Sequence, residues 1–522
     1  MASTRSLRRR RFLQVSAEAI AATFAASRAN WAWAEGTGDL NGLSAAAACD
    51  AMRKGDLKAE DYAAALLARC EAGKPLNAFI SLDPAKVMES AREADRRRAS
   101  GAYLGPLHGL PVPIKDSVNT KDWPTTAGTP ALRNFRPKAD APVVRALYDA
   151  GAILLGKTNM DELSFSWTST NLAFGAVKNP YDQTRIPGGS SGGTAVAVAT
   201  GMAPLGVAED TLGSIRVPAS MCGIAGLRPT TFRYSPRGIV PLTSVFDTAG
   251  PLARTVSDLA LFDSAITGDF NPLRMAPLKG VRLGVPRTHY YADLDPEVER
   301  VTKEALSKLS DAGVVLVEAD VPDLPKLECF GSTSGKWCRP LWYVVTGPFV
   351  AYETVPMVSH YLEEFGTGVT FGQLLAAASP DVKGAMENFV LPGGTRRPPQ
   401  EAYEAARASY RPALQQTFRK YFCETGVAAV VFPTTLVPPT PIGQDQEVEI
   451  NGKKTPFFAA MSRNIRPGSG AGLPGLVLPA GLTNAGLPVG LEFDGPAGTD
   501  RELLALGVAL ETALGRVPPP RM

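Results

Sequence analysis

The chain has 522 residues, of which 45% are hydrophobic and 20% are charged. This balance predicts a globular protein with a large buried core, and it excludes a disordered or fibrous chain. The formal charge of +3 is too small for the concentrated basic face that nucleic acids require, so we expect no nucleic-acid partner. Since the sequence has no run of about 20 apolar residues, we also expect no stable membrane insertion.

Residues 1–34 differ from the rest and resemble a twin-arginine export signal. The run Arg8–Arg11 precedes Phe-Leu and a weakly apolar stretch, and Ala32–Ala34 offers an A-x-A cleavage site. Such signals prefer Ser or Thr before the arginine pair, and Lys where this chain has Gln14, so the alternative is a disordered basic arm. The resemblance implies an exported protein, periplasmic or secreted, with residues 35–522 as the mature domain. Because the signal holds six arginines and one glutamate, the mature formal charge is −2.

The first part of the mature chain is predicted to be helical and then to alternate between strands and helices. Apolar residues at three- and four-residue spacing predict a helical layer over Leu40–Ala72. Short apolar runs then predict strands at Pro111–Ile114 and Ala152–Leu155, on either side of a helix over Ala141–Ala150. A further helix is expected from Asn159, because a glutamate three residues on makes a start that resembles a capping box.

The rest of the chain continues this alternation. Fully apolar runs predict a buried helix over Thr194–Thr200 and a buried strand at Leu205–Ala208, and residues 285–430 are more helical and irregular. Strands that complete the sheet are expected within 428–522, at Ala428–Phe432, Leu476–Leu478 and Val489–Phe493. This pattern predicts an α/β fold, and since no linker, charge block or repeat divides the chain, we expect a single large domain.

The six cysteines are scattered, with no C-x-x-C pair and no histidine partners at the spacing of a zinc site. Buried, unpaired thiols are therefore the expectation. A bridge between Cys329 and Cys338 is the alternative that we retain. We expect no metal and no cofactor.

Two glycine-rich segments, Pro187–Thr194 and Glu209–Pro218, carry the chemistry. Such loops let a backbone approach a ligand closely and can aim free amides at a negative charge. Phosphate binding of the Walker type is set aside, because no lysine precedes Thr194. The first segment also contains G-x-S-x-G, the nucleophile elbow of α/β-hydrolases. That mechanism needs a downstream histidine, and only His289 and His360 follow, neither in a recognisable motif.

A lysine is the remaining candidate for a general base. Lys115 ends an apolar strand, and burial can keep a lysine neutral near pH 7, so that it accepts a proton. The alternative is a strand-end lysine that reaches solvent or pairs with Asp116. Spacing alone does not separate these two hypotheses.

Three motifs together resemble the amidase signature family: P-[IV]-K-D, G-G-S-S-G-G and D-T-x-G-S-[IV]-R, all present in order within residues 105–251, with a further match over 472–495. Details such as Glu162–Phe165 resemble the indoleacetamide and mandelamide hydrolase branch. The resemblance implies a single domain with a mixed β-sheet covered by helices on both faces. It also implies hydrolysis of a small-molecule carboxylic amide to an acid and ammonia or an amine, on aryl or arylalkyl amides.

Carried over to this sequence, the resemblance implies a nucleophile at Ser214, a shuttling serine at Ser190 that follows a cis peptide bond, and a base at Lys115. The acyl-enzyme would form on Ser214. The implied oxyanion-binding and substrate-binding residues are Thr211, Leu212, Gly213 and Ser164, with the amide of Ser214, and the implied supporting residues are Ser191, Asp210 and Arg216.

Two positions depart from the family pattern, which has Gly where this chain has Leu212 and Ser or Thr where it has Glu209. A positive φ at Leu212 would be strained, so the loop is expected to differ locally. The aromatic run from Trp337 to Tyr352 fits either an apolar pocket or core packing, and Phe165 and Trp167 are better pocket candidates.

Other functions compete with this interpretation. A peptide amidase or a carbamate hydrolase would use the same three residues. A glutaminase subunit of an amidotransferase is disfavoured by the export signal, and a non-catalytic binding protein is disfavoured by the retained Lys115, Ser190 and Ser214. A homodimer is left open.

Overall fold

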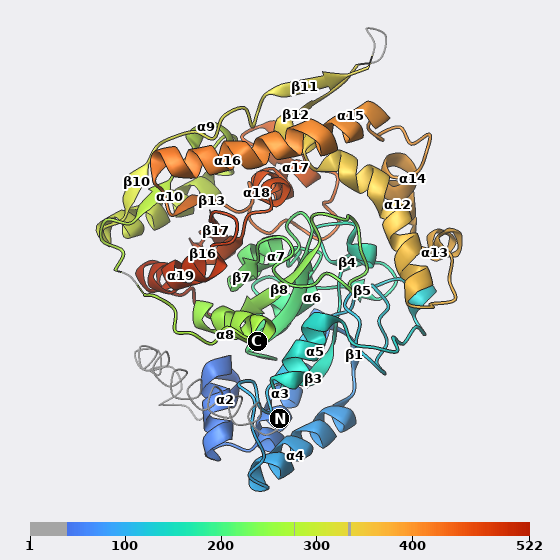
Figure 1. Cartoon of the computed structure of the whole chain (residues 1–522), viewed down its shortest axis with the longest axis vertical. Helices are drawn as coiled ribbons and strands as arrows, with labels where there is room; N and C mark the ends of the chain where they lie inside the picture. The colour runs from blue at the N-terminus through green and yellow to red at the C-terminus, as the bar shows by residue number, and fades with distance from the viewer. Residues whose placement is uncertain (1–38, 276, 332–335, 522) are drawn as a thin grey trace, which may run out of the picture.

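One mixed sheet of 11 strands runs through the centre of the folded molecule (Figure 1). The computed structural model describes residues 39–275, 277–331 and 336–521. The expected export signal, residues 1–34, lies outside these described residues. The strands, in spatial order, are β1 (Phe79–Leu82), β3 (Ile153–Thr158), β2 (Pro111–Lys115), β6 (Leu205–Asp210), β8 (Thr248–Ala253), β7 (Ala225–Arg228), β16 (Gly475–Leu482), β17 (Pro488–Asp494), β13 (Ala429–Pro433), β9 (Arg282–Gly284) and β10 (Val315–Val317).

Parallel and antiparallel pairs occupy different parts of this sheet. β2 is parallel to both β3 and β6, and β9 is parallel to both β13 and β10. The strands from β6 through β8, β7, β16 and β17 to β13 pair antiparallel, as do β1 and β3. The sequence prediction of a strand at each of Pro111–Ile114, Ala152–Leu155 and Leu205–Ala208 is confirmed, because long apolar runs form the strands that are buried on both faces.

Helices cover both faces of the sheet. Successive side chains of a strand point to opposite faces. Two neighbouring residues of β16 show this: a Cβ atom on Gly475 would point at Arg216 of α7, whereas the Leu476 side chain packs on Gly507 of α19. Helices α7 and α19 therefore lie on opposite faces of the sheet. The expected α/β fold of a single domain with a covered mixed sheet is therefore confirmed. The helices of the two faces include α6 (Gly192–Ala199) and α7 (Arg216–Cys222) on one side, and α8 (Val256–Thr267), α10 (Pro296–Asp311) and α19 (Asp500–Leu514) on the other.

The N-terminal helical layer expected over Leu40–Ala72 is confirmed, and it consists of more than one helix (Figure 1). Its first α-helix ends at Lys54, because Gly55 adopts a left-handed conformation and caps it. The helices of this layer are α2 (Ala45–Lys54), α3 (Ala59–Ala72) and α4 (Pro84–Ala99), and α5 (Pro142–Asp149) follows as expected.

The helix expected from Asn159 is wrong. Instead, a single 3-10 turn forms at Glu162–Ser164, with φ of 53° at Leu163 and 57° at Ser164. The Asn159 amide donates to the carbonyls of Asn77 and Gly175, so tertiary hydrogen bonds take the place of the predicted cap. Ser164, at the end of this turn, donates to the buried Glu209 carboxylate.

Residues 285–430 are largely helical, as expected, and their longer helices lie along the outside of the molecule (Figure 1). Strand β10 also joins the main sheet, which the sequence did not predict. A hairpin of β11 (Leu327–Phe330) and β12 (Trp337–Pro340) carries the Cys329–Cys338 disulfide, with an S–S distance of 2.02 Å. The helices here are α9 (Arg287–Tyr290), α11 (Leu341–Val344), α12 (Gly347–Glu364), α13 (Phe371–Ala377), α14 (Pro380–Phe389), α15 (Gln400–Ala405) and α16 (Arg411–Thr425).

Among the remaining cysteines, Cys49, Cys70 and Cys222 are buried free thiols, as expected, but Cys423 is exposed. Two short helices, α17 (Phe457–Ser462) and α18 (Arg466–Ala471), precede β16.

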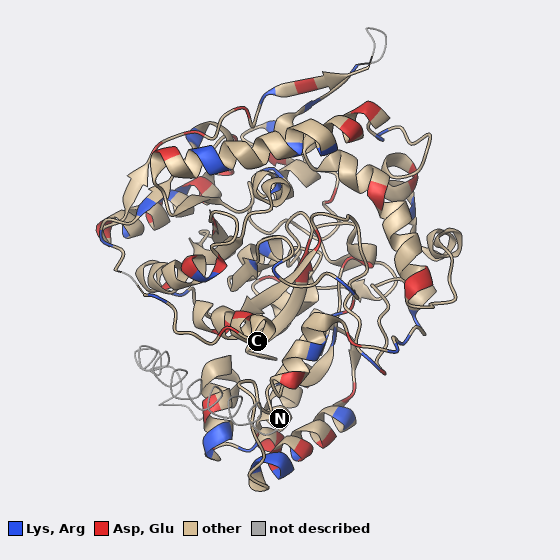
Figure 2. Ribbon diagram, viewed as in Figure 1, with Lys and Arg blue, Asp and Glu red and all other residues tan. Residues whose placement is uncertain are grey.

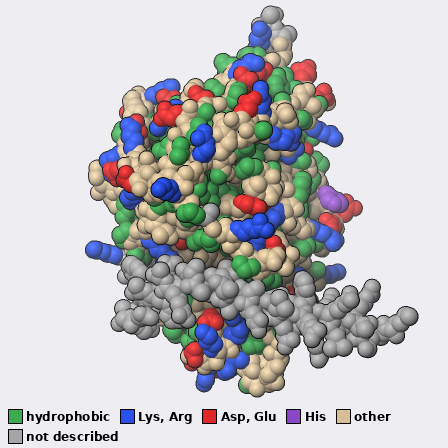
Figure 3. All heavy atoms as spheres, turned by 60° about the vertical axis from the view of Figure 1, so that its left-hand side comes forward, with side chains coloured by type: hydrophobic (Ala, Val, Ile, Leu, Met, Phe, Trp, Pro, Cys, Tyr) green, Lys and Arg blue, Asp and Glu red, His purple; other side chains and the backbone are tan. Residues whose placement is uncertain are grey.

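Charged side chains of both signs are interspersed on the outer helices (Figure 2), and the face seen in Figure 3 mixes acidic, basic and hydrophobic groups. None of the helices in the described ranges is long and apolar enough to cross a membrane.

Candidate active site

Strand pairing brings the ends of β2 and β6 to one edge of the sheet. Because Ile114 pairs with Val207 in parallel register, the residues that follow each partner project at the same edge. Lys115 is the last residue of β2, and β6 ends at Asp210, directly before the loop that carries Ser214. The fold therefore brings two separated sequence motifs together.

Ser190 lies at the same edge, in the loop before α6. The Gly189–Ser190 peptide bond is cis, as the family resemblance implied. Gly189 has no space for a side chain, because a Cβ atom there would lie 2.1 Å from the Asp161 carboxylate. The glycines of this loop thus allow close packing around Ser190, which is fully buried.

Lys115 is fully buried and points at the shuttling serine. Its Nζ lies 2.6 Å from Ser190 Oγ and 2.5 Å from Glu209 Oε1. Burial lowers the pKa of Lys115, whereas the Glu209 carboxylate opposes that shift. The hypothesis of a solvent-reaching lysine is wrong, and so is a pair with Asp116, because that carboxylate lies 3.7 Å from Lys157.

Glu209 is a site residue that the sequence reasoning did not assign. Its Oε1 accepts hydrogen bonds from both Lys115 and Ser164, each at 2.5 Å. The sequence showed that Glu209 departs from the family pattern. It did not show which basic residue the carboxylate would contact. Ser164, expected to bind substrate, donates its hydroxyl hydrogen to this carboxylate.

The loop after β6 is held by Asp210, as expected. Its carboxylate accepts from the amides of Gly213 at 2.8 Å and Ile215 at 3.0 Å, and it pairs with Arg216 and Arg228. Burial acts to raise the pKa of Asp210, but the two guanidinium groups overcome it and hold the pKa well below its usual range. Arg216 also binds Glu492 at 2.7 Å, which ties the loop to β17.

The backbone amides of this loop differ in their availability. The Gly213 amide is already bound by Asp210 and is not free to bind an oxyanion in this conformation. In the described part of the chain, no acceptor binds the amides of Thr211, Leu212 or Ser214. The positive φ of the loop, 118°, is at Gly213 and not at Leu212, so the strain that Leu212 could have caused is absent from this loop.

Ser214 and Ser191 complete the set of predicted residues. Ser214 is buried, with 5% of its surface exposed, and no hydrogen bond joins its hydroxyl to Ser190 or to another described residue. Ser191 donates to the Glu209 backbone carbonyl at 3.2 Å and does not contact Lys115. The structure thus links Lys115 to Ser190 directly and places Ser214 on the neighbouring loop.

Aromatic residues from two regions pack beside Leu212. Phe349 and Phe246 form a cluster with it, and Trp167 Nε1 donates to the Leu212 carbonyl at 3.0 Å. Of the aromatic run that begins at Trp337, only part lies near this loop, because Trp337 itself packs on Phe330 of the β11–β12 hairpin.

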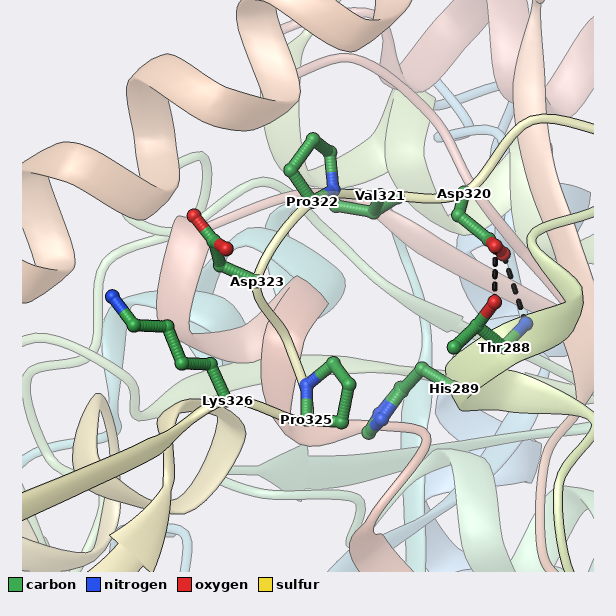
Figure 4. Close-up of a pocket in the computed structure, with 8 residues that line it drawn as sticks. All are labelled: Thr288, His289, Asp320, Val321, Pro322, Asp323, Pro325 and Lys326. Atoms are coloured by element: carbon green, nitrogen blue, oxygen red, sulfur yellow. Dashed lines mark hydrogen bonds between the residues drawn. The ribbon is translucent and has the colours of Figure 1, made fainter.

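The histidines do not support a nucleophile elbow. His289 is buried beside the Arg463 carbonyl, with its pKa lowered to about 3 by burial, and His360 is exposed beside Glu364. His289 lines a cavity of about 360 Å³ between α9 and the segment from Asp320 to Lys326 (Figure 4). None of the three predicted catalytic residues lines it. Within the described ranges, no group of three or more His, Cys, Asp and Glu side chains is placed to hold a metal ion.

Comparison with known proteins decides the family. The sequence model of the amidase family matches residues 61–504. The chain belongs to the amidase family. It is therefore an enzyme that hydrolyses amides to an acid and an amine, as the sequence motifs predicted.

Individual relatives cover most of the chain. An indoleacetamide hydrolase from Agrobacterium vitis is 40% identical over 90% of this chain and 97% of its own length. A mandelamide hydrolase from Pseudomonas putida is 37% identical over 87% of this chain and 88% of its own. A solved amidase structure superimposes with a TM-score of 0.78 at 32% identity, covering 91% of this chain and all of that one.

Proposed function

We propose that this amidase is a serine hydrolase of small aryl or arylalkyl amides, with Ser214 as nucleophile, Ser190 as proton shuttle and Lys115 as base. One observation carries the proposal: the Nζ of a fully buried lysine lies 2.6 Å from the hydroxyl of Ser190, beside the loop of Ser214. A buried amine in hydrogen-bond contact with a hydroxyl is suited to accept its proton.

In the proposed reaction, Lys115 takes the Ser190 proton while Ser190 takes that of Ser214, whose oxygen attacks the amide carbonyl carbon. The resulting oxyanion is stabilised by free backbone amides of the loop, those of Thr211, Leu212 and Ser214. The relay then runs in reverse and protonates the amide nitrogen, the C–N bond breaks, and the amine leaves. Water attacks the ester in the same way, which releases the acid and restores the Ser214 hydroxyl.

Glu209 acts on this relay as a positioning residue. When Lys115 accepts a proton, an ammonium forms 2.5 Å from the Glu209 carboxylate, which stabilises the charge. Ser164 binds the same oxygen and fixes the orientation of the carboxylate. Glu209 thereby makes Lys115 a stronger base than burial alone would allow.

The substrate class rests on the relatives and on the apolar surroundings of the loop. The relatives named above are hydrolases of indoleacetamide and mandelamide, both arylalkyl amides. Next to the proposed oxyanion site lie Leu212, Phe349 and Trp167, which suit an aryl group.

The test is amide hydrolysis by the mature protein and its Ser214→Ala variant. We expect ammonia release from indole-3-acetamide and mandelamide by the wild type, and a loss of at least about 10³-fold in kcat in the variant, since the nucleophile is removed. A fluorophosphonate probe should label the wild type alone. Unchanged hydrolysis by the variant would refute the assignment. Faster turnover of a peptide amide or an aryl carbamate would favour the alternative substrate classes.

Export by the twin-arginine route to the periplasm is a further part of the proposal, supported by the arginine run and the A-x-A site within residues 1–34. A reporter fused to these residues should be exported, and replacement of the arginine pair by lysines should stop it. A reporter retained in the cytoplasm would contradict the proposal.

A homodimer is proposed as the assembly of this protein. Light scattering tests it, and a molar mass equal to that of a monomer would refute it.

A further inference from the structure

Arg466, at the start of α18, is a buried guanidinium that pairs with no carboxylate of the described residues. Only 4% of its surface is exposed. Four aromatic rings surround the guanidinium carbon at 5.2 to 6.0 Å. These rings, the aromatic cage, are Trp167, Trp342, Tyr343 and Phe458.

Most of the hydrogen-bonding capacity of Arg466 is unused. A guanidinium has five N–H donors. Nε donates to Ser462 Oγ and Nη1 to Thr346 Oγ1, each at 2.9 Å, which leaves three N–H groups, two of them on Nη2. No acceptor in the described ranges binds Nη2. Arg228 Nε, which also has no partner, is sealed from solvent, whereas Arg466 Nη2 keeps some exposed surface.

Other buried arginines of this protein are compensated. Arg216 and Arg228 pair with Asp210, and the partly buried Arg254 donates to four backbone carbonyls. The hydrogen-bond partners of Arg466 within residues 39–275, 277–331 and 336–521 are two neutral hydroxyls. Burial lowers its pKa to about 10, so it still carries its charge at neutral pH. A buried charge without a counter-charge is costly, and such a site favours an anion that enters with a ligand.

The aromatic cage adjoins the catalytic loop. Trp167 forms part of the cage, and its Nε1 donates to the carbonyl of Leu212. The residue before Arg466 also contacts the loop, because the Ile465 carbonyl accepts from Arg216 at 3.4 Å. One indole ring therefore separates the free guanidinium donors from the backbone next to Ser214.

One ring of the cage reaches the protein surface, because Phe458 is 36% exposed. The side of Phe458 is therefore where a ligand would approach the guanidinium.

We propose that the aromatic cage and Arg466 form a carboxylate subsite, and that the preferred substrates are aryl or arylalkyl amides with a carboxylate on the part of the molecule distant from the scissile amide. The aromatic rings bind the aryl group, and the three free N–H groups of Arg466 bind the carboxylate in a forked geometry. This inference rests on the proposed function, since it names the substrate class of the same site.

The test compares three amides that share one scaffold: phenylacetamide, 4-carboxyphenylacetamide and its neutral methyl ester. We expect kcat/KM of the wild type to be at least about 10-fold higher for the carboxylate than for either neutral compound, the magnitude of one charge-assisted hydrogen bond. In Arg466→Gln this preference should disappear, mainly through KM, whereas Arg466→Lys should keep part of it.

Arg463→Gln is the matched control. Arg463 is the preceding arginine in the same segment, but its Nη2 donates to the Ala292 carbonyl at 2.6 Å, away from the cage. We expect this variant to keep the wild-type preference for the carboxylate. Equal loss in both variants would show a general effect on folding and overturn the assignment, as would a wild type that hydrolyses the neutral amides equally well.

A binding measurement separates this inference from the proposed catalysis. In Ser214→Ala, 4-carboxyphenylacetamide should quench tryptophan fluorescence at lower concentrations than phenylacetamide, because Trp167 and Trp342 flank Arg466. If the wild type hydrolyses no amide but this difference in binding persists, the proposed function fails and the subsite stands. If hydrolysis occurs and neither preference is seen, the subsite alone is refuted.

Discussion

Replacing Glu209 by glutamine should lower the pH at which the enzyme becomes active. Glutamine keeps the size and the carbonyl oxygen of Glu209 but removes the negative charge that faces Lys115 at 2.5 Å. Activity requires a neutral Lys115, so the acidic limb of the profile of kcat/KM against pH reports the titration of the lysine and its neighbour as a coupled pair. Without the carboxylate, the ammonium form is less stable, so the limb moves to lower pH.

The size of the effect follows from the distance. Two unit charges at 2.5 Å attract by about 7 kcal/mol at an effective dielectric constant near 20. The glutamine oxygen still accepts a hydrogen bond, which retains part of this energy. If only about a fifth is lost, the pKa falls by about one unit, at about 1.4 kcal/mol per unit. The plateau rate should also fall, because the base is weaker.

The assay is ammonia release from the best amide of the panel between pH 4 and 10. Glu353→Gln serves as control, because Glu353 is a buried carboxylate that binds Ser244 and Tyr403 and contacts neither Lys115 nor Ser190. An acidic limb that stays in place or moves to higher pH in Glu209→Gln would refute the role assigned to Glu209. An equal shift in the control would point to a general change in folding.

Two further predictions concern stability. Asp210→Asn leaves Arg216 and Arg228 without their shared carboxylate, so the free energy of unfolding should fall by about 3–5 kcal/mol, seen as a lower melting temperature. The control Asp182→Asn, on the surface, should change the melting temperature little. Equal effects of the two substitutions would contradict the role of Asp210. His289 has a pKa of about 3 when folded, so protons bind the unfolded state first, and stability should fall by up to about 1.4 kcal/mol per pH unit as pH drops from about 6.5 toward 3. His289→Gln should flatten this dependence and the exposed His360→Gln should not; equal slopes would refute this explanation.

Much of the fold could be predicted because the buried strands are continuous apolar runs. Leu205–Asp210 and Ala429–Pro433 lie in the sheet at the positions where the sequence predicted strands. Prediction failed where tertiary contacts override local preference. Asn159 has the side chain of a helix cap, but its amide binds backbone carbonyls of Asn77 and Gly175, which no local pattern encodes.

The proposed site shows the same division. The family resemblance implied that Lys115 and Ser190 share one site, and the structure brings them into hydrogen-bond contact. The partner of Lys115 at Glu209 is 94 residues away, and their contact depends on the parallel pairing of β2 and β6. Arg466 was not predicted either, since its aromatic neighbours come from three separate segments of the chain.

The residues of the proposed relay and those of the aromatic cage come from different parts of the architecture. Lys115 and Glu209 are anchored in adjacent central strands, whereas Arg466 and Tyr343 belong to short helices outside the sheet. Tyr343 on α11 and Phe458 on α17 can therefore be varied with less effect on the hydrolytic residues than α18, whose Ser469 binds Arg216 of the catalytic loop. A library that varies α11 and α17 is thus the shortest route to new acyl-group preferences.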